Sequence, residues 1–529
     1  NRFMPRVLLI GLDGFEPSLA ERWMRGGRLP HLARLRAEGA YLPCRSTQPA
    51  ATFPAWTTCV TGVHPGRHGV FDFTEMAPGA YRLRFVNSSF RKAPALWNIL
   101  SDAGKRVAVL GVPGTYPPEP VNGVMLSGFD SPVASGVDPS FVYPRAYFDV
   151  VKGWRFADYD ESNVGPGWHA RTLPRLLQKV ETKERIATRL LQQEPWDFFM
   201  VVFSESDTVA HHYWMFHDPE SPRHGAGPAD AIEQVYARLD AAVGRLREEA
   251  GDGCLVGVVS DHGFGGAGDG VVHLNNWLEE RGYLKRRGPG GSLAKRLALK
   301  LTPTRLRGAL FRRFQRLAGA AEGRARFAGI DWRGTTAWSE ELNYFPSVRV
   351  NLRGREPEGQ VAPEAYGDFV RDLCAELEAW EPVARAWPRA ALYHGPHVDR
   401  APDIVLELAL EKGYSHSCLR SAGGPAFRRL RPEEYPGGRE RGMNGAHRST
   451  GVLYLSEPPA VAEAGLADVA PTVLAALGVA GPAMDGRDLL GGGEKATAAP
   501  LDGAPEESPY TPEEEARIET RLRKLGYFE

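Results

Sequence analysis

Short apolar runs alternate with segments of helical periodicity along most of this 529-residue chain. The strand-like runs lie at residues 7–12, 107–112, 197–203, 254–260, 348–352, 404–408 and 452–455. Helical spacing of apolar residues marks 29–38, 94–103, 174–193, 229–249 and 468–477. This alternation is typical of a parallel sheet, because a parallel connection needs a crossover of helix length. We therefore expect an α/β fold: a doubly wound, mostly parallel sheet with helices on both faces and a helical insertion.

The chain divides into five predicted parts. They are a core α/β metal-binding part (1–283), a basic helical insertion (284–330), the rest of the core with a smaller subdomain and the loop of His447 (331–490), a linker (491–509) and a C-terminal helix (510–529). Residues 285–326 hold 13 Lys or Arg and one acid, Glu322. A solvated helical hairpin over the edge of the sheet is the favoured interpretation of this basic segment. A lid that attracts phosphate-rich substrates or an anionic membrane surface stays open.

Composition excludes several classes of function. Lys and Arg total 64 against 65 Asp and Glu, a net charge of −1, which argues against whole-surface attraction to nucleic acid or membrane. No aromatic ladder interleaves the basic segment, so we expect no specific nucleic-acid partner. No apolar run approaches the ~20 residues of a transmembrane helix. Five scattered cysteines without a C-x-x-C pair favour reduced thiols and a cytoplasmic location. The oligomeric state is left open.

Three predicted strands end on or near an aspartate. Asp13 follows the first strand, Asp261 follows the strand at 254–260, and Asp207 comes shortly after the strand at 197–203. Parallel sheets bind ligands at the carboxyl ends of their strands. Three carboxylates that converge there would repel one another unless cations held them.

Histidines accompany these acids at ligand spacing. His211 lies four residues after Asp207, on one face of a helix, and His262 adjoins Asp261. His447 lies in a glycine-bearing turn. Mixed oxygen and nitrogen ligands suit zinc, manganese or iron, whereas an all-oxygen site would have suited magnesium or calcium. Taken singly, Asp13 could instead be a helix N-cap and His447 a surface histidine.

A nucleophile is expected near such a site. Thr52 comes just before Pro54, a residue favoured in the first turn of a helix. A hydroxyl there faces free backbone N–H groups and the positive end of the helix dipole, which also attract a phosphoryl group. Metal coordination would make this alcohol a competent nucleophile near neutral pH. Taken singly, Thr52 is more often a helix cap.

Taken together, these residues resemble the alkaline phosphatase superfamily, in its type I phosphodiesterase/nucleotide pyrophosphatase branch. More narrowly, the chain is similar to bacterial proteins described as predicted phosphohydrolase/phosphomutase. The motifs are Gly11-Leu12-Asp13-Gly14, Thr52-Phe53-Pro54, Thr61-Gly62-Val63-His64-Pro65-Gly66-Arg67-His68-Gly69, Asp207-x3-His211, Ser260-Asp261-His262-Gly263 and Gly445-x-His447. Further matches are Pro113–Pro117, Asn351–Pro357, Ala401–Ile404 and Met484–Arg487. The set runs from Val7 to about Leu490.

The resemblance implies two divalent metal ions, with zinc expected. One would be held by Asp207, His211 and His447, and the other by Asp13, Asp261, His262 and the Thr52 oxygen. The ions would lie roughly 4 Å apart. Thr52 would attack phosphorus and form a phosphothreonine that water then hydrolyses. The implied function is a two-metal phosphohydrolase of the phosphodiesterase/nucleotide pyrophosphatase type that cleaves a nucleotide or another small phosphate ester.

One difference between this sequence and the family pattern affects the contacts with substrate. The eukaryotic phosphodiesterases follow Thr-Phe-Pro with an asparagine that touches a phosphoryl oxygen, but Ala55 stands here. That contact must come from elsewhere: a backbone N–H, Asn275 or Arg448. Tyr116 and His273 are further candidate substrate-binding residues, although a structural role is the favoured interpretation of His273. The arginine that selects monoesters in alkaline phosphatases cannot be placed by motif.

Other functions stay open. A phosphomutase or a phosphomonoesterase would use the same residues. A sulfatase is disfavoured, because the C-x-P-x-R pattern is missing where Thr52 stands. A scaffold protein on the same fold is the third alternative, and intact ligands argue against it. His64 and His68 are expected to be structural.

Overall fold

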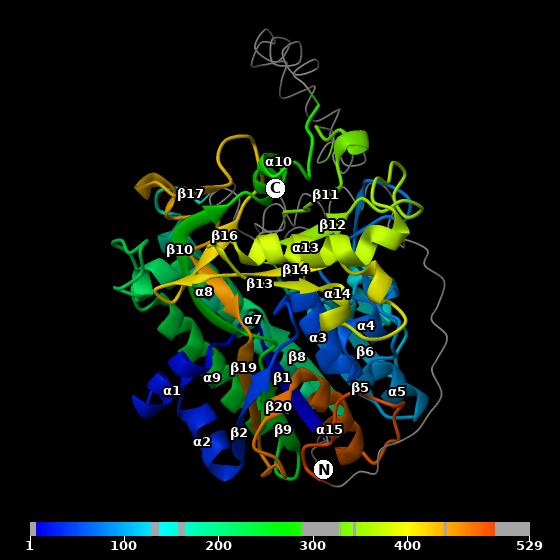
Figure 1. Ribbon diagram of the computed structural model, residues 1–529. Coiled ribbons are helices and arrows are strands. Elements are labelled where there is room, and N and C mark those ends of the chain that lie inside the picture. The colour runs from blue at the N-terminus through cyan, green and yellow to red at the C-terminus, as the bar shows by residue number, and fades with distance from the viewer. Residues whose placement is uncertain are drawn as a thin grey trace, which may run out of the picture.

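A nine-stranded sheet forms the centre of the computed structural model, which describes residues 7–128, 137–156, 164–287, 327, 329–341, 345–437 and 442–491 (Figure 1). In spatial order its strands are β20 (Ala464–Gly465), β2 (Ala40–Arg45), β19 (Thr450–Leu455), β9 (Leu255–Val259), β1 (Val7–Leu12), β8 (Phe198–Phe203), β5 (Val107–Val112), β6 (Gly123–Ser127) and β7 (Val142–Tyr143). The strands from β9 to β6 run parallel. β19 is antiparallel to both of its neighbours, and β7 is antiparallel to β6.

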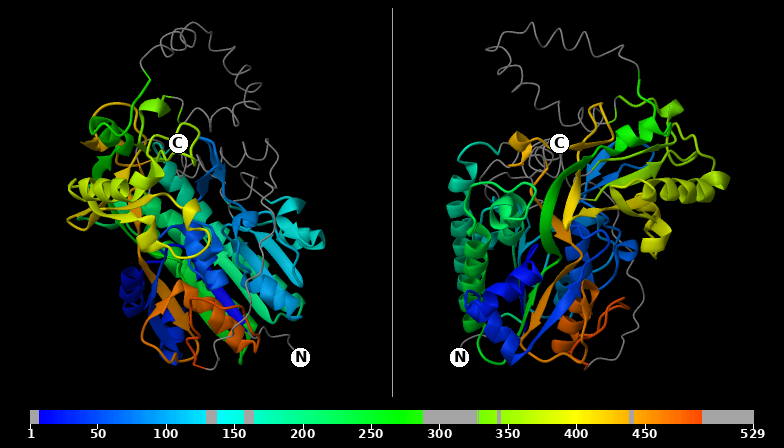
Figure 2. Two further views of the ribbon diagram at one scale, coloured as in Figure 1. Left: turned by 45° about the vertical axis from the view of Figure 1, so that its right-hand side comes forward. Right: turned by 60° about the vertical axis from the view of Figure 1, so that its left-hand side comes forward.

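Helices cover both faces of this sheet (Figures 1 and 2). One face carries α1 (Pro17–Arg25), α2 (Pro30–Glu38), α7 (Trp168–Gln193), α8 (Glu205–His217) and α9 (Ala231–Ala250). The other carries α3 (Thr52–Thr61), α5 (Leu96–Asp102) and α15 (Val469–Ala476). The predicted doubly wound α/β fold is therefore confirmed.

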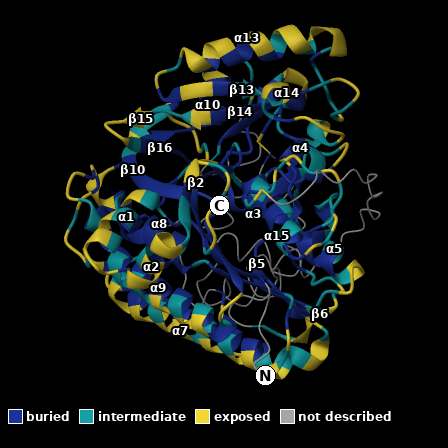
Figure 3. Ribbon diagram, turned by 90° about the horizontal axis from the view of Figure 1, so that it is seen from below, coloured by how far each residue is buried: buried dark blue, intermediate teal, exposed yellow. Residues whose placement is uncertain are grey.

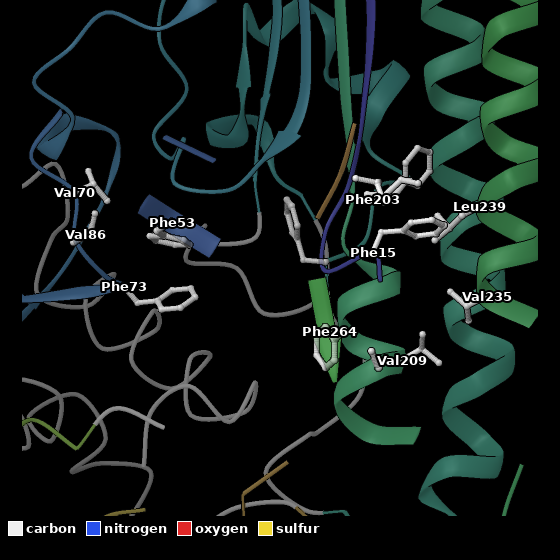
Figure 4. Close-up of a cluster of buried hydrophobic side chains, with 14 of the residues drawn as sticks. Phe15, Phe53, Val70, Phe73, Val86, Phe203, Val209, Val235, Leu239 and Phe264 are labelled. Atoms are coloured by element: carbon white, nitrogen blue, oxygen red, sulfur yellow. The ribbon is translucent and has the colours of Figure 1, made fainter. Parts of the chain in front are cut away.

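The residues of β1 explain why two helical layers are needed. Leu8, Ile10 and Leu12 pack into one apolar cluster, together with Val235 and Leu239 of α9. The alternate residues Val7 and Leu9 pack into a second cluster. Because successive side chains of a strand point to opposite faces, a strand that is apolar at every position must be covered twice. Figure 4 shows the α9 side of this core, where Val235 and Leu239 lie beside Phe15, and Figure 3 shows the exposed outer sides of α7 and α9.

One predicted helix boundary is wrong. The proline at 174 indicates a helix start there, but α7 begins six residues earlier, at Trp168, and contains Pro174. A proline in an early turn removes one backbone hydrogen bond. The buried ring of Trp168 packs 4.9 Å from the His212 ring, which favours continuation of the helix through this turn.

Two smaller sheets lie beyond the carboxyl ends of the central strands (Figure 1). The first contains β15 (Leu410–Glu411), β16 (Tyr414–Cys418), β10 (Gly263–Val272) and β17 (Phe427–Arg429), and β18 (Gly445–Arg448) also pairs with β10. The second is antiparallel: β11 (Ala337–Trp338), β12 (Ser347–Val350), β14 (Ile404–Leu408) and β13 (Val383–Pro388), with α13 (Tyr366–Glu378) against β13. The remaining elements are the hairpin β3 (Thr74–Met76) and β4 (Leu83–Phe85), and the helices α4 (Pro65–His68), α6 (Phe148–Val151), α10 (Leu274–Glu280) and α14 (Arg389–Leu392).

The predicted division into parts stays a prediction. The four-stranded sheet falls within 331–490, the range predicted to hold the smaller subdomain. The basic segment from 288 to 326, most of the predicted linker and the whole predicted terminal helix lie outside the described residues. Within the described ranges, the helices are too short or too polar to cross a membrane.

Candidate functional site

The candidate site lies where three adjacent central strands end. Asp13 directly follows β1, Asp261 follows β9, and Asp207 lies in the first turn of α8, just after β8. The order β9-β1-β8 brings these three chain segments side by side, and the backbone N–H of Asp13 donates to the Phe203 carbonyl at 2.9 Å. All three carboxylates are buried. Strand order thus gathers the acids at one edge of the sheet.

A first group of candidate ligands consists of Asp207, His211 and His447. One ligand atom from each lies within 4.8 Å of the others. Asp207 Oδ1 is 3.3 Å from Nε2 of both histidines, and the two Nε2 atoms are 3.0 Å apart. The one-turn spacing on α8 accounts for the first two members, and β18 supplies the third.

The outer nitrogens of the site's histidines face backbone carbonyls. Nδ1 of His211 lies 3.0 Å from the Gly445 oxygen, and Nδ1 of His447 lies 2.8 Å from the Ala50 oxygen. In His262, Nδ1 lies 2.9 Å from the Gly263 oxygen. In a neutral imidazole, the form that binds a metal ion, a ring nitrogen next to a carbonyl carries the proton and Nε2 keeps a lone pair. The 3.0 Å approach of two such lone pairs in the first group fits a cation between them.

The second group consists of Asp13, Asp261 and His262, again with ligand atoms within 4.8 Å of one another. His262 Nε2 is 3.5 Å from Asp13 Oδ1 and 3.4 Å from Asp261 Oδ2. These three buried atoms have no hydrogen-bond partner among the described residues. Buried polar atoms are normally paired, so a shared empty centre fits a metal ion. The two groups adjoin, because His262 Nε2 lies 3.9 Å from Asp207 Oδ1.

Crowding drives the pKa values of neighbouring groups in opposite directions. Burial raises the pKa of Asp13, and burial together with the charge of Asp13 raises that of Asp261 well above its ordinary value. Although burial opposes it, contact with two histidines lowers the pKa of Asp207 well below its usual range. Burial lowers the pKa of His262, but the surrounding carboxylates outweigh it and raise the pKa to about 10. Burial, aided by the charge of His262, lowers the pKa of His447 to about 3. Divalent cations would stabilise the carboxylate and neutral imidazole forms together.

Further hydrogen bonds orient the carboxylates. The Gly14 N–H donates to Asp261 Oδ1 at 3.1 Å, and the Trp56 indole N–H donates to Asp13 Oδ2 at 3.1 Å. The Ser206 hydroxyl donates to the Asp13 backbone carbonyl at 2.5 Å. In each of these two carboxylates, one oxygen is held and the other faces the centre of the second group.

Thr52 is the first residue of α3 and is buried. Its hydroxyl has no hydrogen-bond partner within the part of the chain that the structure describes. The start of α3 is tied to both ligand groups: His447 contacts the Ala50 carbonyl, and Trp56, one turn after Thr52, holds Asp13. A buried hydroxyl, the positive end of a helix and two candidate metal sites therefore belong to one connected unit.

The position of His447 differs from the expected glycine-bearing turn, and that expectation is wrong. His447 lies on β18, opposite Phe264 in the antiparallel pairing with β10. The preceding Gly445 allows this strand to approach α8, since a Cβ there would lie 2.2 Å from the Ala210 carbonyl. The glycine thus marks a close packing contact.

The four candidate substrate-binding residues lie in different surroundings, and their role stays a prediction. Asn275 exchanges side-chain hydrogen bonds with the Ser339 backbone, and His273 Nδ1 lies 3.1 Å from the Leu419 and Arg420 carbonyls. Tyr116 is buried, with its hydroxyl 3.4 Å from that of Ser140.

Arg448 follows His447 and borders a cavity of about 250 Å³. Its guanidinium donates to the Ser415 hydroxyl at 2.7 Å and to three backbone carbonyls. The cavity is also lined by Gln48, Phe345, Glu407, His416 and His447.

His64 and His68 lie in the segment around α4, which packs against α3. The His68 Nε2 lies 2.9 Å from the hydroxyl of Thr58, and the His64 backbone N–H donates to Asp485 at 2.8 Å. Arg67 also donates to Asp485, at 2.7 Å. The motifs at 61–69 and 484–487 therefore contact each other and close the end of the helix that begins at Thr52.

The doubly wound sheet thus carries two groups of candidate metal ligands at the carboxyl edge of its strands. The model of the family described as type I phosphodiesterase / nucleotide pyrophosphatase matches residues 7–418, and the chain belongs to this family.

Relatives by sequence are ectonucleotide pyrophosphatase/phosphodiesterases. Family member 1 of mouse is 25% identical over 290 residues, which cover 53% of this chain and 26% of the relative. Family member 1 of human is 26% identical over 284 residues. Family member 3 of mouse is 33% identical over 97 residues, 18% of this chain and 11% of the relative. The matched parts span about a quarter or less of these longer proteins.

Two solved structures share the fold. Phosphonoacetate hydrolase from Sinorhizobium meliloti, in complex with phosphonoformate, matches with a TM-score of 0.54 and 16% identity over 90% of this chain and 96% of that chain. An inactive murine ectonucleotide pyrophosphatase/phosphodiesterase 5, in complex with AMP, matches with a TM-score of 0.50 and 14% identity over 92% of this chain and 100% of that chain.

Proposed function

We propose that this protein is a two-metal-dependent phosphodiesterase of the nucleotide pyrophosphatase type. It would cleave a small phosphate ester through a phosphothreonine on Thr52. The observation that carries the proposal is the buried Thr52 hydroxyl, without a hydrogen-bond partner among the described residues, on a helix tied to both ligand groups. Membership of the family supports the reaction class.

Asp207, His211 and His447 would hold one metal ion, and Asp13, Asp261 and His262 would hold the other together with the Thr52 oxygen. The mixture of imidazole and carboxylate ligands favours zinc, with manganese or iron as alternatives. When bound, the ions would neutralise charge on the phosphoryl group and lower the pKa of a coordinated hydroxyl.

The residues of the chain then have distinct tasks. The Thr52 oxygen forms a bond to phosphorus while the bond from phosphorus to the leaving oxygen breaks, and the leaving group takes up a proton. Water next attacks phosphorus, which restores Thr52 and releases a phosphate monoester. The N-terminus of α3 favours the anionic phosphoryl group at this position throughout. The catalysis rests on positioning and on charge stabilisation.

The substrate class is tested with a panel. Purified protein, stripped of metal and then reloaded with zinc or manganese, is assayed with bis(p-nitrophenyl) phosphate, p-nitrophenyl phosphate, a p-nitrophenyl nucleotide diester and phosphonoacetate. We expect metal-dependent cleavage, with the two diesters preferred. Preference for the monoester would favour a phosphomonoesterase. In labelled water, hydrolysis incorporates solvent oxygen into the released phosphate, whereas a phosphomutase would not.

The nucleophile is tested with Thr52→Ala beside a matched control. Thr57→Ala removes the same hydroxyl elsewhere in α3, where it donates to the Phe53 carbonyl. We expect Thr52→Ala to lower kcat by roughly 10³-fold or more when it is assayed at saturating metal. Thr57→Ala should retain most activity. Equal activity of Thr52→Ala and the wild type would refute the proposal.

We propose a cytoplasmic location. All five cysteines are buried and free, which supports a reducing compartment. Fractionation of the producing cell tests this, and recovery of the protein outside the cytoplasm would contradict it.

A further inference from the structure

The three candidate ligands of the second group are oriented in the same way: one polar atom is held by a hydrogen bond, and the other faces the centre of the group. Asp13 and Asp261 each have one carboxylate oxygen held by an N–H group and the other directed to the centre. His262 has Nδ1 against a carbonyl and Nε2 toward the centre. For Asp261 and His262 the holding group belongs to the backbone, but for Asp13 it is the indole of Trp56.

The position of Trp56 follows from the helix that carries Thr52. Residues four apart lie on one face of a helix, so α3 presents Thr52 and Trp56 toward the same strand end. The indole is fully buried, and its Nε1 is 3.1 Å from Asp13 Oδ2. An indole nitrogen can only donate, so this contact fixes which atom holds the proton.

The strand that carries Asp13 makes room for this ring. Gly11 lies on β1 two residues before Asp13, on the same face of the strand as Val7 and Leu9. A Cβ at Gly11 would lie 2.5 Å from the Trp56 ring. The ring therefore packs directly against the backbone of β1 on one side.

We infer that Trp56 is a positioning residue for the metal site of Asp13, Asp261 and His262. This inference rests on the proposed function. Trp56 holds Oδ2 of Asp13 and leaves Oδ1, which faces the centre of the group, as the oxygen that would bind a cation. Without the indole N–H, Asp13 gains rotational freedom, and the cation must order the carboxylate as it binds.

The test compares Trp56→Phe with a matched variant. Trp97 is also fully buried, belongs to the same apolar cluster and donates its indole N–H to Glu119 at 2.8 Å, away from the site. Trp97→Phe therefore removes the same type of hydrogen bond from the same core. Bound metal is counted by elemental analysis, and affinities are measured by competition with a chromophoric chelator. Thermal unfolding of the metal-free proteins monitors folding.

We expect wild type and Trp97→Phe to bind two zinc ions with similar affinities. Trp56→Phe should bind one of the two ions about 10–100-fold more weakly and the other unchanged. Weakening of both ions equally, or of neither, would overturn the inference. If the wild type itself binds less than one ion per chain, the proposed function fails instead.

A second measurement distinguishes a local effect of Trp56→Phe on the metal site from a general loss of structure. Asp13→Asn removes a ligand, so adding Trp56→Phe to it should weaken metal binding little further, because both changes act on one site. Additive losses, or loss of both ions with a lowered apo melting temperature, would show a structural effect and overturn the inference.

Discussion

Among single residues, Gly14 constrains the site through its contact with Asp207. It has φ of 62°, and a Cβ there would lie 3.1 Å from Asp207 Cα, Cβ and Oδ1. We predict that Gly14→Ala loses metal affinity and activity, because it displaces Asp207 in addition to straining the backbone. The backbone strain alone should cost roughly 1–2 kcal/mol of unfolding free energy.

Gly27→Ala is the matched control for Gly14→Ala. Gly27 has φ of 72°, and a Cβ there meets nothing within 4 Å. Gly27→Ala should lose a similar amount of unfolding free energy, measured by chemical denaturation. It should keep wild-type metal affinity, measured by chelator competition. Equal metal affinity in both variants would contradict the role assigned to Gly14.

Proton release should accompany metal binding at His262. In the metal-free protein its pKa of about 10 means that the ring carries a proton at pH 7, and a metal ligand must be neutral. Cation affinity at this site should therefore rise with pH, by about tenfold per unit for one displaced proton, up to the region of that pKa. Titration calorimetry in buffers of different ionisation enthalpy measures the release. Affinity that is flat from pH 6 to 9 would contradict the prediction.

The candidate ligands could be predicted because each sits at a position with a local signature. Asp13, Asp207 and Asp261 follow apolar strands, and His211 has helical spacing. Trp56 gave no such signal, since an indole in a buried helix looks like core, although its four-residue distance from Thr52 places it on the same face. The strand around His447 was missed because its pairing with β10 lies far away in sequence.

Of the elements, β10 was hardest to predict. Its sequence, Gly263–Val272, contains five glycines, and glycine weakens strand propensity. The structure explains this composition by close approach: a Cβ at Gly263 would lie 2.1 Å from the Thr450 carbonyl, and one at Gly266 would lie 2.6 Å from the Tyr414 ring. Such contacts are tertiary, so local periodicity cannot reveal them.

A buried carboxylate, Asp403, connects several segments of the antiparallel four-stranded sheet. Asp403 accepts hydrogen bonds from Arg355 at 2.6 and 2.8 Å, from Tyr366 at 2.6 Å and from the Val350 N–H at 2.7 Å. We predict that Asp403→Ala lowers the unfolding free energy by about 3–5 kcal/mol, because it leaves Arg355 without its main partner.

Asp368→Ala provides the comparison for Asp403→Ala. Asp368 pairs with Arg371 at the surface, where the two side chains are 74% and 67% exposed. Its loss should cost under about 1 kcal/mol. Denaturant unfolding of both variants gives the two values, and similar costs would contradict a special role for Asp403.

On the scale of the whole molecule, distant segments meet at one edge of the central sheet. The ligand groups combine residues from 13 to 447, carried by strand ends, by α8 and by β18. The alternation of strands and helices was enough to predict the doubly wound sheet, because a strand that is apolar at every position must be buried on both faces. The sequence could not predict the sheet order, which decides that the ends of β9, β1 and β8 are neighbours.

Removal of metal should therefore destabilise the molecule as a unit. Without cations, three buried carboxylates face one another at the ends of adjacent strands. Bound metal at about 1,000 times its Kd would stabilise the fold by about 4 kcal/mol. We predict that chelation lowers the melting temperature and that zinc restores it, whereas Asp207→Asn should show a smaller shift because one group is impaired. Because both apolar clusters are untouched, the stripped protein should still unfold cooperatively. An unchanged melting temperature after verified metal removal would mean that the cations do not link these segments.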